Sequence, residues 1–169
     1  MPVPGAEQDW VLDTVEALRR ADEEPDRLGE RVLILEAVGH VQGVGLGELL
    51  ADQGRETTVV TALPVLLACD GETQAAILPR AVQAGVRWRP STALAAIGDH
   101  EATLVDVLSH QADTVPVDTV VIVTNGVPNT ELYRALEGQV PELARVGDAV
   151  SVRPVDRAVY DGQRAGRAL

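Results

Sequence analysis

The sequence is poor in cysteine and aromatic residues, and it contains no lysine. Its one cysteine, Cys69, excludes an internal disulfide, a multi-cysteine zinc site and an iron–sulfur cluster held by this chain alone. Phenylalanine is absent and aromatic residues make up 2% of the chain, whereas apolar residues make up 46%. The core must therefore consist mainly of Val, Ala and Leu, which favours close packing of helices on a sheet.

Negative charge dominates the sequence. The 14 basic residues, all of them Arg, stand against 26 acidic residues and give a net charge of −12. This balance argues against nucleic acid or an anionic membrane as a partner. No apolar run reaches the roughly 18 residues of a membrane span, and residues 1–10 lack a basic region followed by an apolar one. We therefore expect a cytoplasmic protein.

The apolar pattern predicts alternating helices and strands. Predicted helices are 9–21, 43–53, 72–84, a short one ending at 136, and 154–169; predicted strands are 31–36, 57–61, 86–89, 92–97, 102–108, 118–124 and a strand near 144–146. Residues 31–61 have the size of a βαβ unit, and the three strands over 86–108 suggest an antiparallel meander. The predicted fold is α/β and Rossmann-like, with three layers: a parallel sheet, helices on both of its faces, and a small antiparallel β-meander.

The loop after the first buried strand, residues 36–47, occupies the position at which a dinucleotide fold holds a pyrophosphate. Its spacing never completes the G-x-G-x-x-G fingerprint, and Glu36 would place a carboxylate against the phosphates. Residues 61–64, after the second strand, offer neither an acid for a ribose hydroxyl nor an Arg for a 2′-phosphate. The candidate cofactor-binding residues in this loop are Gly39, His40, Gly43 and Gly45.

Each of these residues also has a purely structural interpretation. Gly43 and Gly47 lie four residues apart on one helix face and would allow close helix–strand packing. The alternative for His40 is simple solvent exposure.

The remaining histidines and the cysteine do not form a recognisable catalytic or metal-binding pattern. The spacing of His100 and His110 matches no ligand motif, and residues 98–101 are typical of a hairpin turn. We interpret Cys69 as inert, because no base is fixed beside it in the sequence. The prediction is that the chain carries no catalytic residues and no metal site of its own.

Several segments of the chain together resemble a known family. Residues 31–40, 45–54 and 58–61 look like the degenerate pyridine-nucleotide-type domain of trimethylamine dehydrogenase-like flavoproteins, which are related to 2,4-dienoyl-CoA reductases and other long NADH:flavin oxidoreductases. Residues 118–130 resemble the stretch by which such proteins return to their FAD-type domain. Residues 147–149 and the helix over 158–165 resemble its closing segment.

The apolar pattern gives a leader and helix over 1–30. The resemblance, which covers about residues 31–169, implies a degenerate NAD(P)-type Rossmann domain with its meander over 31–116 and the closing strand and helix of an FAD-type domain over 117–169. Asp148 matches the position at which relatives approach the flavin or its ribityl chain, so Gly147 and Asp148 are further candidate cofactor-binding residues. Asn125 departs from the family's Ala/Gly-rich turn. FAD, ADP or NAD(P) are the cofactors implied for this chain. FMN and a 4Fe-4S centre are expected only in a partner.

Two functions from different classes follow. The leading hypothesis is a small non-catalytic subunit of a split flavin-dependent oxidoreductase, which completes the nucleotide-binding region of a larger FMN and iron–sulfur flavoprotein in a hetero-oligomer. The alternative is an independent Rossmann-like nucleotide-binding or sensor module. The strand over 118–124 must accordingly either join the edge of the sheet of residues 31–61 or complete a sheet in another polypeptide.

Overall fold

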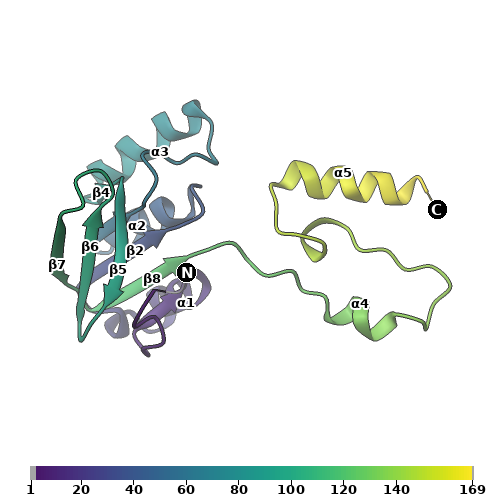
Figure 1. The fold of residues 1–169 in the computed structure, drawn as a ribbon, viewed down its shortest axis with the longest axis horizontal. Coiled ribbons are helices and arrows are strands. Elements are labelled where there is room, and N and C mark those ends of the chain that lie inside the picture. The colour runs from purple at the N-terminus through teal and green to yellow at the C-terminus, as the bar shows by residue number, and fades with distance from the viewer. Residues whose placement is uncertain (1–2, 169) are drawn as a thin grey trace. The chain divides into compact units, whose positions relative to one another are not determined.

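The computed structural model describes residues 3–168. The chain divides into two compact units, which we call unit 1 (Met1–Thr124) and unit 2 (Asn125–Leu169). Unit 1 contains both sheets, and unit 2 contains the two C-terminal helices (Figure 1). In the described part of the chain no helix is both long and apolar enough to cross a membrane.

The centre of unit 1 is a parallel sheet. Its strands, in spatial order, are β1 (Val11–Asp13), β8 (Thr119–Val123), β2 (Arg31–Glu36), β3 (Glu56–Val60) and β4 (Arg87–Arg89). The predicted strand 118–124 therefore joins the sheet of residues 31–61, but in its interior, where Val121 lies opposite Ile34 of β2 and Leu12 of β1. As a result the compact unit continues to Thr124, past the expected boundary at residue 116.

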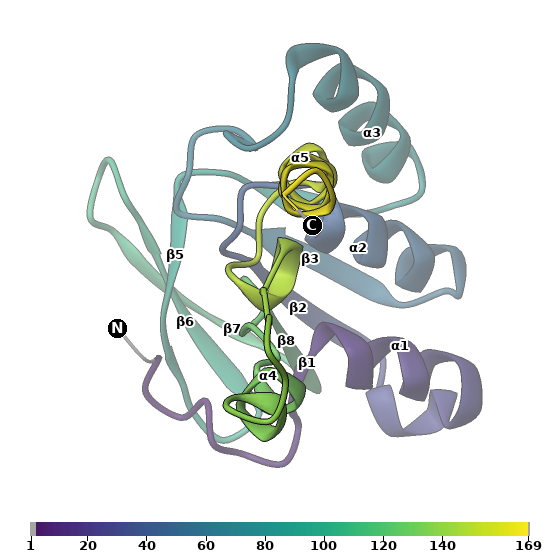
Figure 2. The ribbon, with the colours of Figure 1, turned by 90° about the vertical axis from the view of Figure 1, so that its right-hand side faces the viewer.

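Three helices cover one face of this sheet: α1 (Thr14–Glu23), α2 (Gln42–Asp52) and α3 (Gly71–Gln83) (Figure 2). A short 3-10 turn, η1 (Pro25–Leu28), follows α1. The core between helices and sheet is aliphatic, as the composition predicts, with Ile34, Leu50 and Val121 fully buried. Helix α1 begins where the Asp13 carboxylate accepts a hydrogen bond from the Glu16 amide at 2.8 Å.

The other face of the sheet packs against an antiparallel meander of β5 (Thr92–Ile97), β6 (Glu101–Asp106) and β7 (Ala112–Pro116) (Figure 1). Leu33, Val60 and Val120 of the parallel sheet form a second core with Leu94 and Leu104 of the meander. The Rossmann-like fold with a meander is thus confirmed. Within unit 1, however, helices occupy one face only, because the meander takes the other.

The membership of the meander differs from the prediction. Residues 86–89 were expected to be its first strand, but β4 pairs parallel to β3, with Trp88 opposite Val59. The third strand of the meander is β7 instead, which pairs with β6. Most of its side chains are exposed, so its sequence lacks the apolar alternation that reveals a strand.

An ion pair joins the amino ends of β2 and β8. The Asp118 carboxylate accepts hydrogen bonds from the Arg31 guanidinium at 2.6 and 3.2 Å, and from the backbone amides of Arg31 and Glu30 at 2.8 and 3.1 Å. These hydrogen bonds, above all that from the Arg31 guanidinium, lower the pKa of Asp118 to about 2. Asp118 therefore fixes the start of β8 against the start of β2.

Unit 2 consists of α4 (Glu131–Leu136), the 3-10 turn η2 (Gly147–Ala149) and α5 (Val155–Gly166), joined by turns and irregular segments. The expected strand near 144–146 is extended at Val146 (φ −139°, ψ 160°), but it pairs with no strand in residues 3–168. Helix α5 falls within the predicted helix 154–169, and the last residue of that prediction, Leu169, lies outside the described residues. Within 125–168 only Gly147 is buried, so unit 2 lacks a hydrophobic core.

Candidate functional site

The turn between β2 and α2 is where a Rossmann-like domain places a phosphate, and here it holds a carboxylate of its own. Glu36 ends β2 and is completely buried. Its Oε1 accepts hydrogen bonds from the amides of Val38 at 2.8 Å and Gly39 at 2.9 Å, and its Oε2 accepts one from the amide of Gly43 at 2.7 Å. The positive end of α2 adds to this stabilisation, because Gly43 lies in the first turn of the helix.

The glycines of this turn serve the carboxylate and the packing of α2. Gly39 adopts a φ of +76°, which L residues rarely adopt, and its carbonyl accepts a hydrogen bond from the Ala68 amide at 2.8 Å. A Cβ at Gly43 would lie 2.7 Å from Glu36 Oε2, and a Cβ at Gly47 would lie 2.8 Å from Val59 Cγ2. Gly45 meets nothing within 4 Å. The predicted close packing of α2 on the sheet is confirmed at Gly47, while Gly43 leaves room for the Glu36 carboxylate.

The groups that would complete a dinucleotide site are missing from the end of β3. Thr61 follows β3 and is buried, and its hydroxyl accepts a hydrogen bond from the Leu63 amide at 3.2 Å. Pro64 follows shortly after, so residues 61–64 offer neither a carboxylate nor a guanidinium. His40 is half-buried rather than freely exposed.

These observations test whether the turn fits the nucleotide that its fold implies. A phosphate needs free amide donors and space for its oxygens. Here the amides of Gly39 and Gly43 already donate to Glu36, and Glu36 Oε2 fills the space beside Gly43. Like charges about 4 Å apart repel by about 4 kcal/mol at an effective dielectric constant of 20, so a phosphate beside this carboxylate would be strongly disfavoured. As they stand, Gly39, His40, Gly43 and Gly45 do not fit a dinucleotide pyrophosphate.

The second predicted group of cofactor residues lies in unit 2. Gly147 has a φ of +57°, and a Cβ there would come within 3.2 Å of the Ala158 side chain on α5. Asp148 follows it in η2 and is exposed, as is Asn125 at the start of the unit. This geometry gives Gly147 a packing role against α5. A role for Gly147 and Asp148 at a flavin stays a prediction.

Cys69 lies close to this turn, since the amide of its neighbour Ala68 binds the Gly39 carbonyl, whereas His100 and His110 lie in the turns of the meander. Burial, followed by the charges of Asp70 and Glu36, raises the pKa of the Cys69 thiol, which opposes thiolate formation. His100 has a φ of +52° in the turn between β5 and β6 and stacks on Trp10 at a centroid distance of 4.9 Å. His110 has a φ of +61° between β6 and β7. No group of three or more potential metal ligands occurs within residues 3–168.

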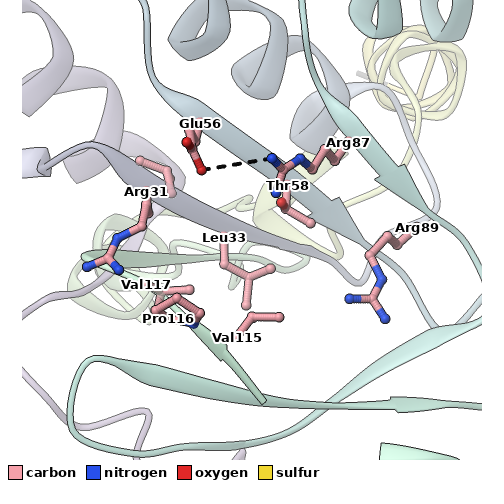
Figure 3. Close-up of a pocket in the computed structure, with 10 residues that line it drawn as sticks. Arg31, Leu33, Glu56, Thr58, Arg87, Arg89, Val115, Pro116 and Val117 are labelled. Carbon is pink, nitrogen blue, oxygen red and sulfur yellow. Dashed lines mark ion pairs between the residues drawn. The ribbon is translucent and has the colours of Figure 1, made fainter. Parts of the chain in front are cut away.

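A cavity of about 170 Å³ lies at the amino ends of β2, β3 and β4, between the sheet and β7 (Figure 3). Its three arginines are matched by carboxylates. Arg31 binds Asp118, Arg89 donates two hydrogen bonds of 3.0 Å to Asp113, and Arg87 lies 4.0 Å from Glu56. Nucleotides bind at the opposite, carboxyl ends of the strands in such folds. We therefore interpret the residues of this cavity as contacts that hold the meander on the sheet.

Sequence reasoning identified Glu36 as an obstacle to phosphate but did not foresee its hydrogen bonds. The sequence did contain a signal for them. An acid at the end of a buried strand, when glycines and a helix follow, lies close to the first amides of that helix, which have no partner within the helix. The capping pair Asp13 and Glu16, which ends β1 and starts α1, was likewise readable as a D-x-x-E pattern.

The sheet, its meander and the βα turn define a Rossmann-like domain of the FAD/NAD(P)-binding type. The family model of the pyridine nucleotide-disulphide oxidoreductases matches residues 1–147, and the chain belongs to this family. A search of curated protein sequences gives no match.

Three solved structures with the same fold are much longer chains. The 6-hydroxypseudooxynicotine amine oxidase of Pseudomonas geniculata N1 is 24% identical, with a TM-score of 0.82 over 98% of this chain and 25% of the other. Histamine dehydrogenase from Rhizobium sp. 4-9 is 22% identical, with a TM-score of 0.83 over 100% of this chain and 27% of the other. A 2-naphthoyl-CoA reductase is 20% identical, with a TM-score of 0.83 over 98% of this chain and 24% of the other. The chain thus spans about a quarter of the length of these structures.

Proposed function

We propose that this chain is a non-catalytic component of a flavin-dependent oxidoreductase, in which unit 2 completes an FAD-type domain of a larger flavoprotein. The proposed partner carries the FMN, the iron–sulfur centre and the catalytic residues. This proposal rests chiefly on one observation: in the described part of unit 2 the apolar side chains do not pack into a core.

Both helices of unit 2 lack buried residues. Several of the large apolar side chains of the unit are highly exposed, including Val127 at 89%, Leu132 at 72%, Val155 at 78% and Val159 at 56%. Leaving such side chains in water forfeits about 1.5–3 kcal/mol for each one that a partner would bury fully. A segment of this size without a core, disulfide or metal is not expected to be stable by itself. We infer that another protein surface covers it.

The chemistry of that surface is suggested by residues 144–146. This segment is extended at Val146 and has no ladder partner in the described chain, so its backbone donors and acceptors are available to a sheet edge. The proposed occupant is the open edge of a flavin-type sheet, with α5 packing beside the added strand. The similarity to a long amine oxidase, a histamine dehydrogenase and a 2-naphthoyl-CoA reductase, of which this chain spans about a quarter, supports a partner of that class.

Affinity purification of the tagged full chain from the organism that encodes it tests the proposal. We expect co-purification of a larger barrel-type flavoprotein, identified by mass spectrometry, together with flavin absorbance in the eluate. The double variant Leu132→Asp/Val159→Asp should lose this partner, because a charge at an interface core strongly opposes binding. Leu108→Asp is the matched control, since Leu108 is 80% exposed but belongs to unit 1.

Two outcomes would overturn the proposal: a colourless chain that associates with no flavoprotein, or a flavoprotein that binds the double variant as well as the unmodified chain. The alternative of an independent nucleotide-binding module predicts saturable heat on titration with NADH, NADPH, FAD or ADP. The occupied turn after β2 does not favour it.

A further inference from the structure

The turn after β2 has the construction of an anion-binding site. Three backbone amides, those of Val38, Gly39 and Gly43, donate to the same carboxylate at the amino end of α2. Backbone amides in this arrangement bind phosphates and carboxylates without any basic side chain. Gly39 supplies the left-handed backbone conformation and Gly43 leaves the space.

The anion in this site is part of the protein. The two oxygens of Glu36 accept from these amides at 2.7–2.9 Å, distances typical of charge-assisted hydrogen bonds. The side chain is fully buried, and the space that a phosphate oxygen would need beside Gly43 is taken by Glu36 Oε2. The two oxygens of the Glu36 carboxylate thus occupy the positions that two oxygens of a bound phosphate would take.

We propose that Glu36 is a built-in ligand of a latent anion site, so that the turn is closed to the phosphates of FAD and NAD(P) and becomes an anion receptor when this side chain is removed. The family to which the chain belongs is of the FAD/NAD(P)-binding type, whereas in this chain the Glu36 carboxylate holds the amides of the turn. The inference concerns unit 1 alone and stands whether or not unit 2 binds a flavoprotein.

Chemical rescue of Glu36→Ala in the full chain tests the proposal. The variant should be less stable to urea than the unmodified chain, because three amides lose their acceptor. Formate, acetate or inorganic phosphate, added at constant ionic strength, should restore stability saturably. At ten times the dissociation constant of the anion, the equilibrium constant for unfolding should fall about 11-fold. The unmodified chain should show no such response to these anions, to pyrophosphate or to NADH.

Two further measurements keep the test decisive if Glu36→Ala folds poorly. Glu36→Gln preserves the volume but places an amide NH₂ among donors, so it too should be destabilised. Amide exchange followed by NMR should show Val38, Gly39 and Gly43 protected in the unmodified chain, exposed in Glu36→Ala and protected again with formate. Glu72→Ala, which removes an exposed carboxylate from the first turn of α3, is the control and should show no anion response.

The proposal is overturned by any of three results. One is stabilisation of the unmodified chain by pyrophosphate or NADH to the same extent as Glu36→Ala. Another is a folded Glu36→Ala whose stability and amide exchange do not respond to anions. The third is a Glu36→Gln variant as stable as the unmodified chain.

Discussion

Replacing Asp118 with Asn should weaken unit 1 by an amount that depends on pH in a defined way. The side chain is 28% exposed and binds both the Arg31 guanidinium and two backbone amides at the start of β2. Its pKa falls from 3.8 to about 2 on folding, which corresponds to about 2 kcal/mol. Solvent screening around the half-exposed Arg31 reduces this figure, so we expect Asp118→Asn to lower the free energy of unfolding by about 1–2 kcal/mol at pH 7.

The sign of the pH dependence follows from the lowered pKa. A carboxyl group with a folded pKa below its unfolded value stabilises the protein above the unfolded pKa and loses this contribution as the pH falls toward the folded one. The difference between the unmodified chain and Asp118→Asn should therefore be constant from pH 7 to about pH 5 and shrink between pH 4 and the folded value of about 2. Urea unfolding followed by circular dichroism at several pH values measures it, with Asp99→Asn in the exposed β5–β6 turn as control. An equally stable variant at pH 7, or a difference that is as large at pH 3 as at pH 7, would refute the reasoning.

Three further predictions concern packing and reactivity. Gly47→Ala should destabilise unit 1 by about 1–3 kcal/mol in urea unfolding, because its Cβ would lie 2.8 Å from a Val59 methyl group. Gly45→Ala is the control: its Cβ would meet open space, so this substitution should stabilise α2 by up to about 1 kcal/mol. Equal effects of the two substitutions would contradict this reasoning. Cys69 should react with iodoacetamide more slowly in the folded chain than in urea, because burial raises the pKa of its thiol. Equal rates would show that the thiol is not protected. Leu132→Asp should change the unfolding of unit 1 by less than about 0.5 kcal/mol, since the side chain is 72% exposed in unit 2, and a larger loss would mean that Leu132 supports unit 1.

The elements with long apolar runs could be predicted from the sequence. β2 and β8 are buried on both faces, and every residue between the first and last positions of each strand is apolar, which is typical of interior parallel strands. The pattern failed where burial is slight or the element is short. β1 has only three residues, and β7 is largely exposed, so neither produces a period that can be recognised.

The candidate site shows a different limit. The sequence revealed a misplaced acid in an otherwise phosphate-type turn, but it could not show in which direction the Glu36 side chain points. That direction depends on the φ of Gly39 and on the space at Gly43, which are properties of the folded turn. The sequence also does not show which strands pair with each other. An apolar run such as 118–124 is a recognisable strand, but its pattern does not specify the neighbours that it has in the sheet.

The position of β8 in the sheet also determines the order in which the molecule can be completed on the ribosome. β1 and β2 are made early but do not pair with each other, because Val120 and Val121 of β8 lie between them. The middle of the sheet therefore stays open until almost all of unit 1 has emerged, and long-range closure of this kind makes folding slow. During synthesis the nascent chain exposes two apolar strand edges, at β1 and β2, and it is in this interval that we expect it to depend most on chaperones.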